Sequence, residues 1–103
     1  MGKEIFYDKN ALRELHEFSN EVQKEFQAYI TILAFEGRLE FPEARKVTTD
    51  LFEIRIAQEG TYRGFYAYLA GRYVVILHFF QKKTQKTPLK NIKLAKQRLR
   101  KYE

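Results

Sequence analysis

Cysteine is absent from the 103-residue chain, and several other features that would reveal a function directly are absent too. Without cysteine there is no disulfide framework, thiolate zinc site, iron–sulfur cluster or cysteine nucleophile. No apolar run approaches the roughly 18 residues that cross a membrane, and the N-terminal segment lacks the apolar core of a secretory signal. We therefore expect a soluble cytoplasmic protein with no membrane partner.

The short motifs of common enzyme classes are missing as well. The chain has no phosphate-binding P-loop, dinucleotide fingerprint, HExxH zinc motif or serine-hydrolase elbow. Its two histidines, His16 and His78, are far apart and have no carboxylate cluster beside them, so we expect no metal site and no cofactor. His78 lies in the most apolar segment and is predicted to be a hydrogen-bonded core residue, whereas His16 is predicted to lie at the surface.

Acidic residues are missing from one long segment. Residues 60–102 contain neither Asp nor Glu, although the chain has 13 acidic residues in all. The 19 Lys and Arg residues give a net charge of +6, and they are densest between Lys82 and Lys101. A positive field of this kind favours a phosphate-bearing partner, of which nucleic acid is the first candidate. The alternative is a solvated basic helix that only keeps the protein soluble.

The composition and the periodicity of the chain predict one α+β domain across residues 1–103. The chain is 45% apolar, with two prolines and no linker-like segment. An N-terminal strand (residues 3–7) precedes a helical hairpin, in which Asp8 or Asn10 caps the first helix and Leu12 and Leu15 lie on its apolar stripe. Asn20 with Gln23 resembles a capping box for the second helix, which should end at Gly37. Residues 38–50 show no period and are predicted to be a loop.

The second half predicts an antiparallel β-meander and a terminal helix. The strands are expected at residues 51–57, 62–69 and 73–80, the first with Ile54 on one face and Glu53 and Arg55 on the other, polar face. Thr87 and Pro88 are typical of a helix start, with the proline at the first helical position. The apolar positions of this helix then recur as far as Tyr102.

Basic and phenolic side chains fall on or beside adjacent predicted strands. Antiparallel pairing could gather these side chains around one concave face of the sheet: Arg55, Arg63, Tyr66, Lys82, Lys83 and Lys86. Arginine binds phosphate oxygens as a fork, lysine is a tunable proton donor, and tyrosine offers a ring on which a base stacks. Such a site could cleave RNA without metal, by in-line attack of the 2′-hydroxyl on the neighbouring phosphate. Surface ion pairing of the arginines and simple packing of the tyrosines remain open alternatives.

Three segments in this order resemble a known family. LFEIR at residues 51–55, YRGFY at residues 62–66 and ILHFFQKKTQKTP at residues 76–88, followed by the helix that bears Ala95, are similar to the RelE/ParE superfamily of toxins and within it to the phage-derived HigB-like branch. The resemblance implies a RelE-like fold and a type II toxin, in particular a ribosome-dependent, metal-independent mRNA endoribonuclease. It also implies a cognate antitoxin, often a HigA-like helix-turn-helix protein, with which the toxin forms a hetero-oligomer.

The resemblance also implies roles for individual residues. Arg55 and Arg63 would hold the scissile phosphate, Tyr66 would orient or stack a base, and Lys82 and Lys83 would stabilise the leaving group or donate its proton. The basic residues at the C-terminal end would dock on ribosomal RNA: Lys86, Lys90, Lys93, Lys96, Arg98, Arg100 and Lys101.

The family pattern also leaves alternatives open. Glu53 stands where RelE has a catalytic lysine, so the general base is Glu53, a lysine or no single group. Tyr102 is not assigned a catalytic role. Because the superfamily includes ParE-like poisons of DNA gyrase, that function is an alternative, and so is a non-enzymatic RNA- or DNA-binding module.

Overall fold

The N-terminal part of the chain forms strand β1 (Glu4–Tyr7), helix α1 (Lys9–His16) and helix α2 (Asn20–Glu36). A computed structural model of the protein describes residues 2–40, 42, 44–56, 61–83, 86 and 88–103. Asp8 caps α1 as predicted, because its side chain accepts hydrogen bonds from the N–H groups of Asn10 (2.9 Å) and Ala11 (3.3 Å). Gly37 ends α2 in the left-handed conformation (φ 84°), also as predicted.

Two details of these helices differ from the prediction. Ser19, not Asn20, caps α2 by accepting from the N–H of Val22 (3.3 Å), and the Gln23 amide donates instead to the carbonyl of Phe18 (2.9 Å). The cap lies one residue earlier because the serine hydroxyl reaches the third N–H of the helix. Leu12 is 36% exposed, and the neighbouring Ala11 takes the buried position on α1.

A mixed sheet forms the centre of the molecule. Its described strands are β2 (Ala44–Lys46), β3 (Phe52–Arg55), β4 (Tyr62–Tyr68) and β5 (Tyr73–Gln81), in addition to β1. The strand order is β1-β5-β4-β3-β2, in which β3, β4 and β5 form the predicted antiparallel meander and β1 pairs in parallel with β5. The α+β prediction is confirmed.

The prediction that residues 38–50 form only a loop is wrong, because β2 lies within them. This strand pairs antiparallel with β3, and Arg45 lies opposite Glu53. With three residues, of which Arg45 and Lys46 are exposed, β2 is too short to produce an alternating pattern in the sequence.

The C-terminal part forms helix α3 (Leu89–Leu99) and a 3₁₀ turn, η2 (Arg100–Tyr102). Pro88 is the residue before the helix rather than its first residue, and it makes no side-chain cap. The predicted cap Thr87 lies outside the described residues. Ala95 and Leu99 are buried against the sheet and Ile92 and Tyr102 pack beside them, as the apolar stripe predicts.

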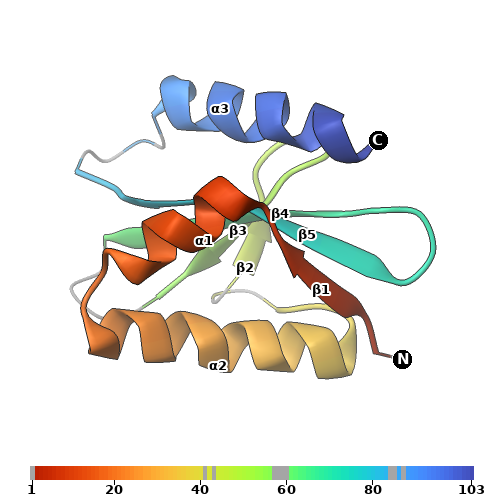
Figure 1. Cartoon of the computed structure of the whole chain (residues 1–103), viewed down its shortest axis with the longest axis horizontal. Helices are drawn as coiled ribbons and strands as arrows, with labels where there is room; N and C mark the ends of the chain where they lie inside the picture. The colour runs from red at the N-terminus through yellow and green to blue at the C-terminus, as the bar shows by residue number, and fades with distance from the viewer. Residues whose placement is uncertain (1, 41, 43, 57–60, 84–85, 87) are drawn as a thin grey trace.

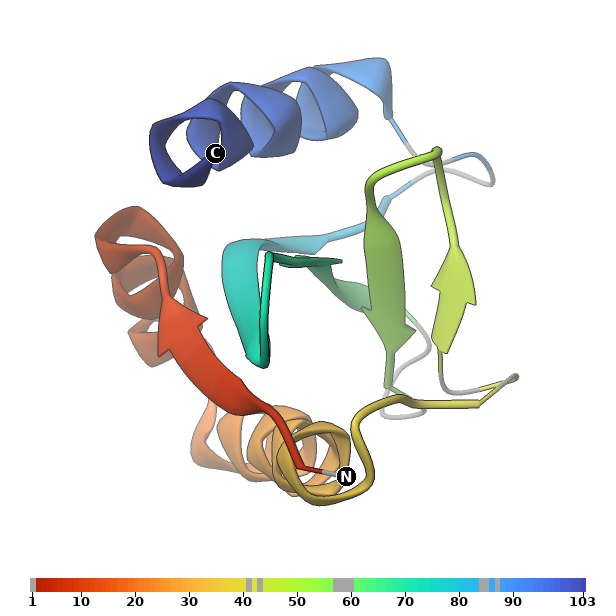
Figure 2. The same ribbon diagram turned by 90° about the vertical axis from the view of Figure 1, so that its right-hand side faces the viewer.

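One face of the sheet is covered by α3, and the other is covered by α2 together with α1. Figures 1 and 2 show α3 on one face and α2 on the other, with α1 beside the sheet near β1. The core on the α1 and α2 side contains residues such as Leu15, Phe26 and Ile76, and the core under α3 contains Phe65, Leu77 and Phe80. None of the helices in the described part of the chain is both long enough and apolar enough to cross a bilayer.

Candidate functional site

Charged side chains of β2, β3 and β4 meet on the α3 side of the sheet. The strand register places Arg45 opposite Glu53, and Arg55 opposite Arg63. Because Glu53 and Arg55 are two residues apart on β3, they project from the same face. The opposite face of β3 carries Ile54, which belongs to the core on the α2 side. The sheet thus brings Arg55 and Arg63 together, which the predicted meander required.

A buried carboxylate lies at the centre of this group. Glu53 is fully buried, although the alternating pattern predicted it on an exposed polar face. Its Oε1 accepts a hydrogen bond from Arg45 Nε at 2.9 Å, and its Oε2 lies 3.7 Å from Arg63 Nε. The negative charge offsets the repulsion between guanidinium groups that face each other across two strands. We call Arg45, Glu53, Arg55, Arg63 and Lys82 the cationic cluster.

The arginines of the cationic cluster differ in depth. Arg63 is 5% exposed, and its Nη1 donates to the carbonyl of Tyr62 at 3.0 Å. Burial lowers the pKa of Arg63, and Glu53 opposes this effect. The Arg45 side chain is 46% exposed and Arg55 is half-buried. Arg63 therefore forms the base of the cluster, and Arg45 and Arg55 lie nearer the solvent.

A bulge in β5 sets the direction of the residues that follow it. Phe65 pairs with His78 but Tyr66 pairs with Ile76, so that Leu77 is an extra residue between them. Beyond the bulge, Phe80 lies opposite Arg63 and packs on Phe65. The shift of register brings the continuation of β5, and with it Lys82, to the side of the sheet that carries the arginines.

Lys82 belongs electrostatically to the cationic cluster. Partial burial lowers the pKa of its ammonium group and the positive charge of Arg63 lowers it further, while Glu53 raises it. A lysine with a lowered pKa is a better proton donor at neutral pH than an ordinary lysine. Lys83, the next residue along the chain, is exposed.

Tyr66 lies on the opposite face of the sheet from the arginines, contrary to the prediction. Its side chain is 1% exposed, lies in the core on the α2 side and stacks on Phe52 with 5.5 Å between ring centroids. Burial raises the pKa of its hydroxyl. The prediction that Tyr66 stacks a base is wrong for this structure, because an enclosed ring presents no face to a ligand.

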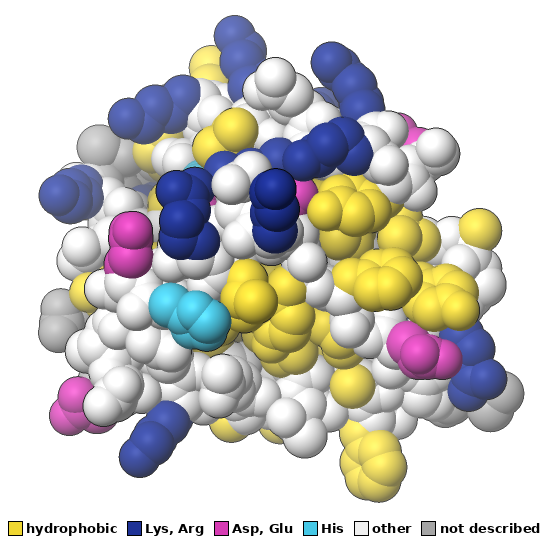
Figure 3. All heavy atoms as spheres, in the orientation of Figure 1, with side chains coloured by type: hydrophobic (Ala, Val, Ile, Leu, Met, Phe, Trp, Pro, Cys, Tyr) yellow, Lys and Arg dark blue, Asp and Glu magenta, His cyan; other side chains and the backbone are white. Residues whose placement is uncertain are grey.

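Most of the predicted nucleic-acid-binding residues lie on the surface near α3. The exposed ones are Lys86, Lys90, Lys93, Lys96, Arg100 and Lys101. Figure 3 shows Lys and Arg side chains gathered along the edge of the molecule that α3 forms. The Nζ of Lys101 also lies 3.3 Å from the buried carboxylate of Asp8.

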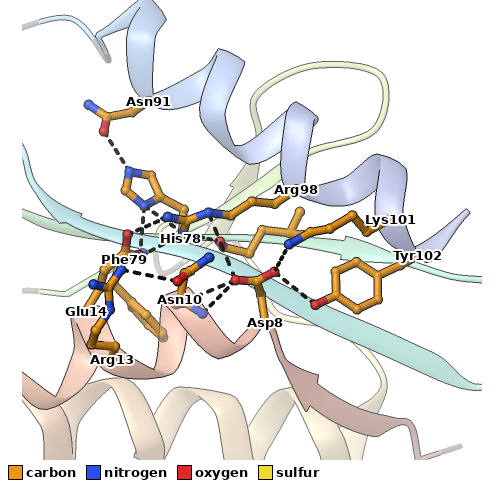
Figure 4. Close-up of polar contacts among 12 residues, drawn as sticks. Asp8, Asn10, Arg13, Glu14, His78, Phe79, Asn91, Arg98, Lys101 and Tyr102 are labelled. Atoms are coloured by element: carbon orange, nitrogen blue, oxygen red, sulfur yellow. Dashed lines mark hydrogen bonds and ion pairs between the residues drawn. The ribbon is translucent and has the colours of Figure 1, made fainter.

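Arg98 is the exception, and the prediction that it binds nucleic acid is wrong. It is 8% exposed, and its guanidinium donates to both carboxylate oxygens of Glu14 (3.1 and 2.9 Å) and to the carbonyl of Leu77 (2.9 Å) (Figure 4). The amphipathic spacing of the sequence predicted that Arg98 faces solvent together with the lysines of α3. Its long side chain instead reaches past the helix into a polar network with α1 and β5.

This network confirms the prediction for His78. One ring nitrogen lies 2.9 Å from Oε1 of Glu14 and the other 2.7 Å from Oδ1 of Asn91 on α3 (Figure 4). Burial of Glu14 acts to raise its pKa, but hydrogen bonds from His78 and Arg98 outweigh it and lower the pKa to about 2. The hydroxyl of Tyr102 donates to Asp8 at 2.9 Å. The network joins α3 and η2 to α1 and the sheet, which is a structural role.

Comparison with known proteins places the chain in a family. The sequence model of the family described as "Phage derived protein Gp49-like (DUF891)" matches residues 13–100. The chain belongs to the Gp49-like family. No curated protein matches this Gp49-like chain in sequence.

Solved structures share the fold of the Gp49-like chain. The E. coli toxin RelE, as a double mutant in the free state, matches with a TM-score of 0.74 and 18% identity over 96% of this chain and 99% of that one. The archaeal RelE–RelB complex from Pyrococcus horikoshii OT3 matches with a TM-score of 0.61 and 20% identity, over 81% of this chain and 98% of that one. The toxin–antitoxin complex RelBE2 from Mycobacterium tuberculosis matches with a TM-score of 0.62 and 20% identity, over 80% of this chain and 100% of that one. At this level of identity the likeness establishes a RelE fold.

Sequence reasoning missed Arg45, the one residue of the cationic cluster that lies on β2. Its segment has no period, and an isolated arginine among other charged residues carries no signal. Only its position opposite Glu53 in the sheet identifies it. Within the described residues, no three carboxylate or imidazole side chains come together as a metal site would require.

Proposed function

We propose that this Gp49-like protein is the toxin of a type II toxin–antitoxin system, in the HigB-like branch, and that it cleaves messenger RNA on the ribosome without a metal ion. The observation that carries the proposal is the cationic cluster, which lies on a RelE fold. Proteins of that fold named as toxins support the first part of the proposal. The chemistry of the cluster supports the second.

The cluster has the groups that metal-free phosphate chemistry needs. Arg55 and Arg45 would bind the non-bridging oxygens of the scissile phosphate, and Arg63 would stabilise the negative charge that develops when the 2′-hydroxyl attacks. Lys82 would donate a proton to the departing 5′-oxygen, a role that its lowered pKa favours. Lys83 remains a proposed second cation for the leaving group.

Glu53 receives a positioning role rather than that of a general base. It is enclosed and ion-paired with Arg45 and Arg63, so substrate reaches the arginines before it reaches the carboxylate. Its effect on the reaction would be to hold the two guanidinium groups in the orientation that phosphate requires.

The proposed partners follow from charge and from the relatives. The exposed cations of α3 and its flanks would dock on ribosomal RNA, because they gather along one edge of the molecule, where their charges add. Relatives with the same fold form complexes with RelB antitoxins. We expect a cognate antitoxin here, of the HigA-like helix-turn-helix type, in a cytoplasmic hetero-oligomer.

The test is induction of the protein in a bacterial host, with new messenger RNA 5′ ends and gyrase-linked DNA breaks mapped in parallel. The proposal expects RNA ends that are in phase with codons and that occur only on translated messages. Arg63→Lys should abolish both toxicity and cleavage while the protein stays folded, because lysine keeps the charge but lacks the fork of N–H groups that faces Glu53 and the Tyr62 carbonyl and so cannot hold its charge in the same place. Arg72→Lys, at an exposed position before β5, is the matched control and should behave as wild type.

Other outcomes would replace the proposal. DNA breaks without new RNA ends would identify a gyrase poison. Salt-sensitive binding of free RNA without cleavage, unaffected by Arg63→Lys, would identify a basic binding module. Full toxicity of a folded Arg63→Lys protein would refute the assignment of the site.

A further inference from the structure

The C-terminal half of α2 exposes large apolar side chains on the face that points away from the sheet. Phe35 is 80% exposed and Ile32, one helical turn earlier, is 44% exposed. Figure 3 shows an apolar side chain projecting from the edge of the molecule that α2 forms. Polar residues normally occupy such positions on a surface helix, so paired apolar residues there indicate an interaction that the isolated chain does not make.

A groove lies beside these residues. It encloses about 220 Å³ and is lined by Tyr29, Ile32, Glu36, Arg38, Leu39 and Glu40. Its wall is apolar where α2 contributes Tyr29 and Ile32 and where Leu39 follows the helix. We call this feature, together with Phe35, the α2 groove.

The rim of the α2 groove is acidic. Glu36 and Glu40 are exposed, and Arg38 Nε lies 2.8 Å from Oε2 of Glu40. Because this ion pair neutralises Glu40, the net charge of the rim is the negative charge of Glu36. Nucleic acid would be repelled by such a rim, whereas a cationic side chain would be attracted. This charge is opposite to that of the α3 surface on the other face of the sheet.

We propose that the α2 groove is a docking site for an amphipathic helix of a partner protein, which inserts apolar side chains one turn apart and places lysine or arginine beside Glu36. Ile32 and Phe35 are themselves one turn apart, which matches the spacing of anchors on a helix laid along α2. α2 offers side chains and no free strand edge, so an added β-strand would find no backbone partner there. A second copy of the chain is a poorer occupant, because its net charge of +6 opposes self-association.

This inference does not rest on the proposed nuclease function. α2 and α3 lie on opposite faces of the sheet (Figure 1), and the cationic cluster is on the α3 side. A helix in the α2 groove would therefore leave the cluster open to a ligand, and the two surfaces are testable separately.

The experiment uses the full-length protein and a labelled synthetic peptide, an amphipathic helix with leucine at its a and d heptad positions and lysine at the flanking positions. Binding is followed by fluorescence anisotropy. Phe35→Ser and Ile32→Ser should each weaken binding about tenfold, or about 1.4 kcal/mol, because each removes an apolar side chain that the complex buries. Leu89→Ser is the matched control, since Leu89 is 71% exposed on α3, and it should bind as wild type.

A further variant and a second peptide test the charge. Glu36→Gln should weaken binding of the lysine peptide, and a peptide with glutamate in place of lysine should not bind the wild-type protein. Equal binding of both peptides, or undiminished binding by Phe35→Ser, would overturn the proposal. Sedimentation velocity of the protein alone tests whether a second copy occupies the groove. A dimer that Phe35→Ser abolishes would assign the groove to a second copy and overturn the proposal.

Discussion

Glu53 allows the arginines of the cationic cluster to lie close together despite their like charges. It is fully buried between Arg45 and Arg63, so its charge compensates two cations that would otherwise repel each other. Removing one member of a buried ion pair leaves the other charged and desolvated, which costs more than the pair itself contributes. The same residue is thus important for stability and for the orientation of the candidate site.

We predict that Glu53→Gln destabilises the protein by about 3 kcal/mol, because Arg63 loses the compensating charge while it stays buried. Urea denaturation followed by circular dichroism measures the change. Glu17→Gln, at an exposed position in the loop after α1, should leave the unfolding midpoint within error of wild type. A stable Glu53→Gln protein would mean that Arg63 finds solvent or another partner when the carboxylate is removed.

Gly64 lies where two aromatic rings approach the backbone of β4. A Cβ atom at this position would lie 3.0 Å from Cδ1 and Cε1 of Phe79 and 3.3 Å from Cε1 of Phe26. The glycine of the YRGFY segment is therefore required by packing.

We predict that Gly64→Ala costs about 1–3 kcal/mol in unfolding free energy through overpacking. A double-mutant cycle with Phe79→Leu checks the cause, since a smaller side chain at position 79 should recover part of the loss. Additive effects in the cycle would show that the close approach to Phe79 is not the source.

At the scale of elements, α3 is attached to the rest of the molecule by polar as well as apolar contacts. Arg98, Asn91 and Tyr102 each bond a residue of α1, β5 or the β1–α1 junction (Figure 4). The apolar stripe through Ala95 and Leu99 gives α3 its buried face. The polar contacts fix its position along the sheet, because hydrogen bonds are directional and apolar packing is not.

We predict that Arg98→Met destabilises the protein by about 2–3 kcal/mol, because Glu14 loses two charge-assisted hydrogen bonds while it remains largely buried. Chemical denaturation is the measurement. Lys96→Met, an exposed position on the same helix, makes the matched control and should have almost no effect. If both variants unfold at the same denaturant concentration, the Arg98–Glu14 ion pair contributes nothing.

The lowered pKa of Glu14 predicts a pH dependence of stability. Its pKa is about 2 in the folded protein against an ordinary value of 4.5. A carboxyl whose pKa is lowered on folding contributes stability that is complete above its unfolded pKa and is lost as the pH falls toward its folded pKa. We therefore expect the urea midpoint to fall between pH 5 and pH 2.5, and to fall less in Glu14→Gln; identical slopes for the two proteins would contradict this.

At the scale of the whole molecule, the charges are separated between faces. The exposed lysines of α3 lie on one side of the sheet and Glu36 and Glu40 of the α2 groove lie on the other (Figure 1). This separation is what the two proposals require, since one face would bind RNA and the other a partner protein.

We predict that the logarithm of the binding constant for single-stranded RNA falls linearly with the logarithm of the salt concentration. Lys90→Gln/Lys93→Gln should reduce the steepness of this line by about 1.4, or about 0.7 for each phosphate that is no longer neutralised. Filter binding over a salt series measures it. Lys24→Gln, on the exposed side of α2, should leave the slope unchanged. An unaltered slope in the double variant would exclude α3 as the RNA-binding surface.

Local signals in the sequence predicted most of the helices and strands correctly. Local signals are strong where one residue acts on its own backbone or one period repeats, as with the Asp8 cap, Gly37 at the end of α2 and the apolar stripe of α3. The charge asymmetry and the segment at residues 51–88 also indicated the fold and a phosphate-binding chemistry before any tertiary contact was known.

Which charged and aromatic side chains come together depends on tertiary contacts. It moved Tyr66 and Arg98 into the interior, brought Arg45 beside Glu53 and, through one extra residue in β5, turned Lys82 toward the arginines. These outcomes depend on strand register and on the reach of long side chains across elements. Neither the register nor this reach can be recognised from a short segment of sequence, because register is set by how the whole sheet buries its two faces.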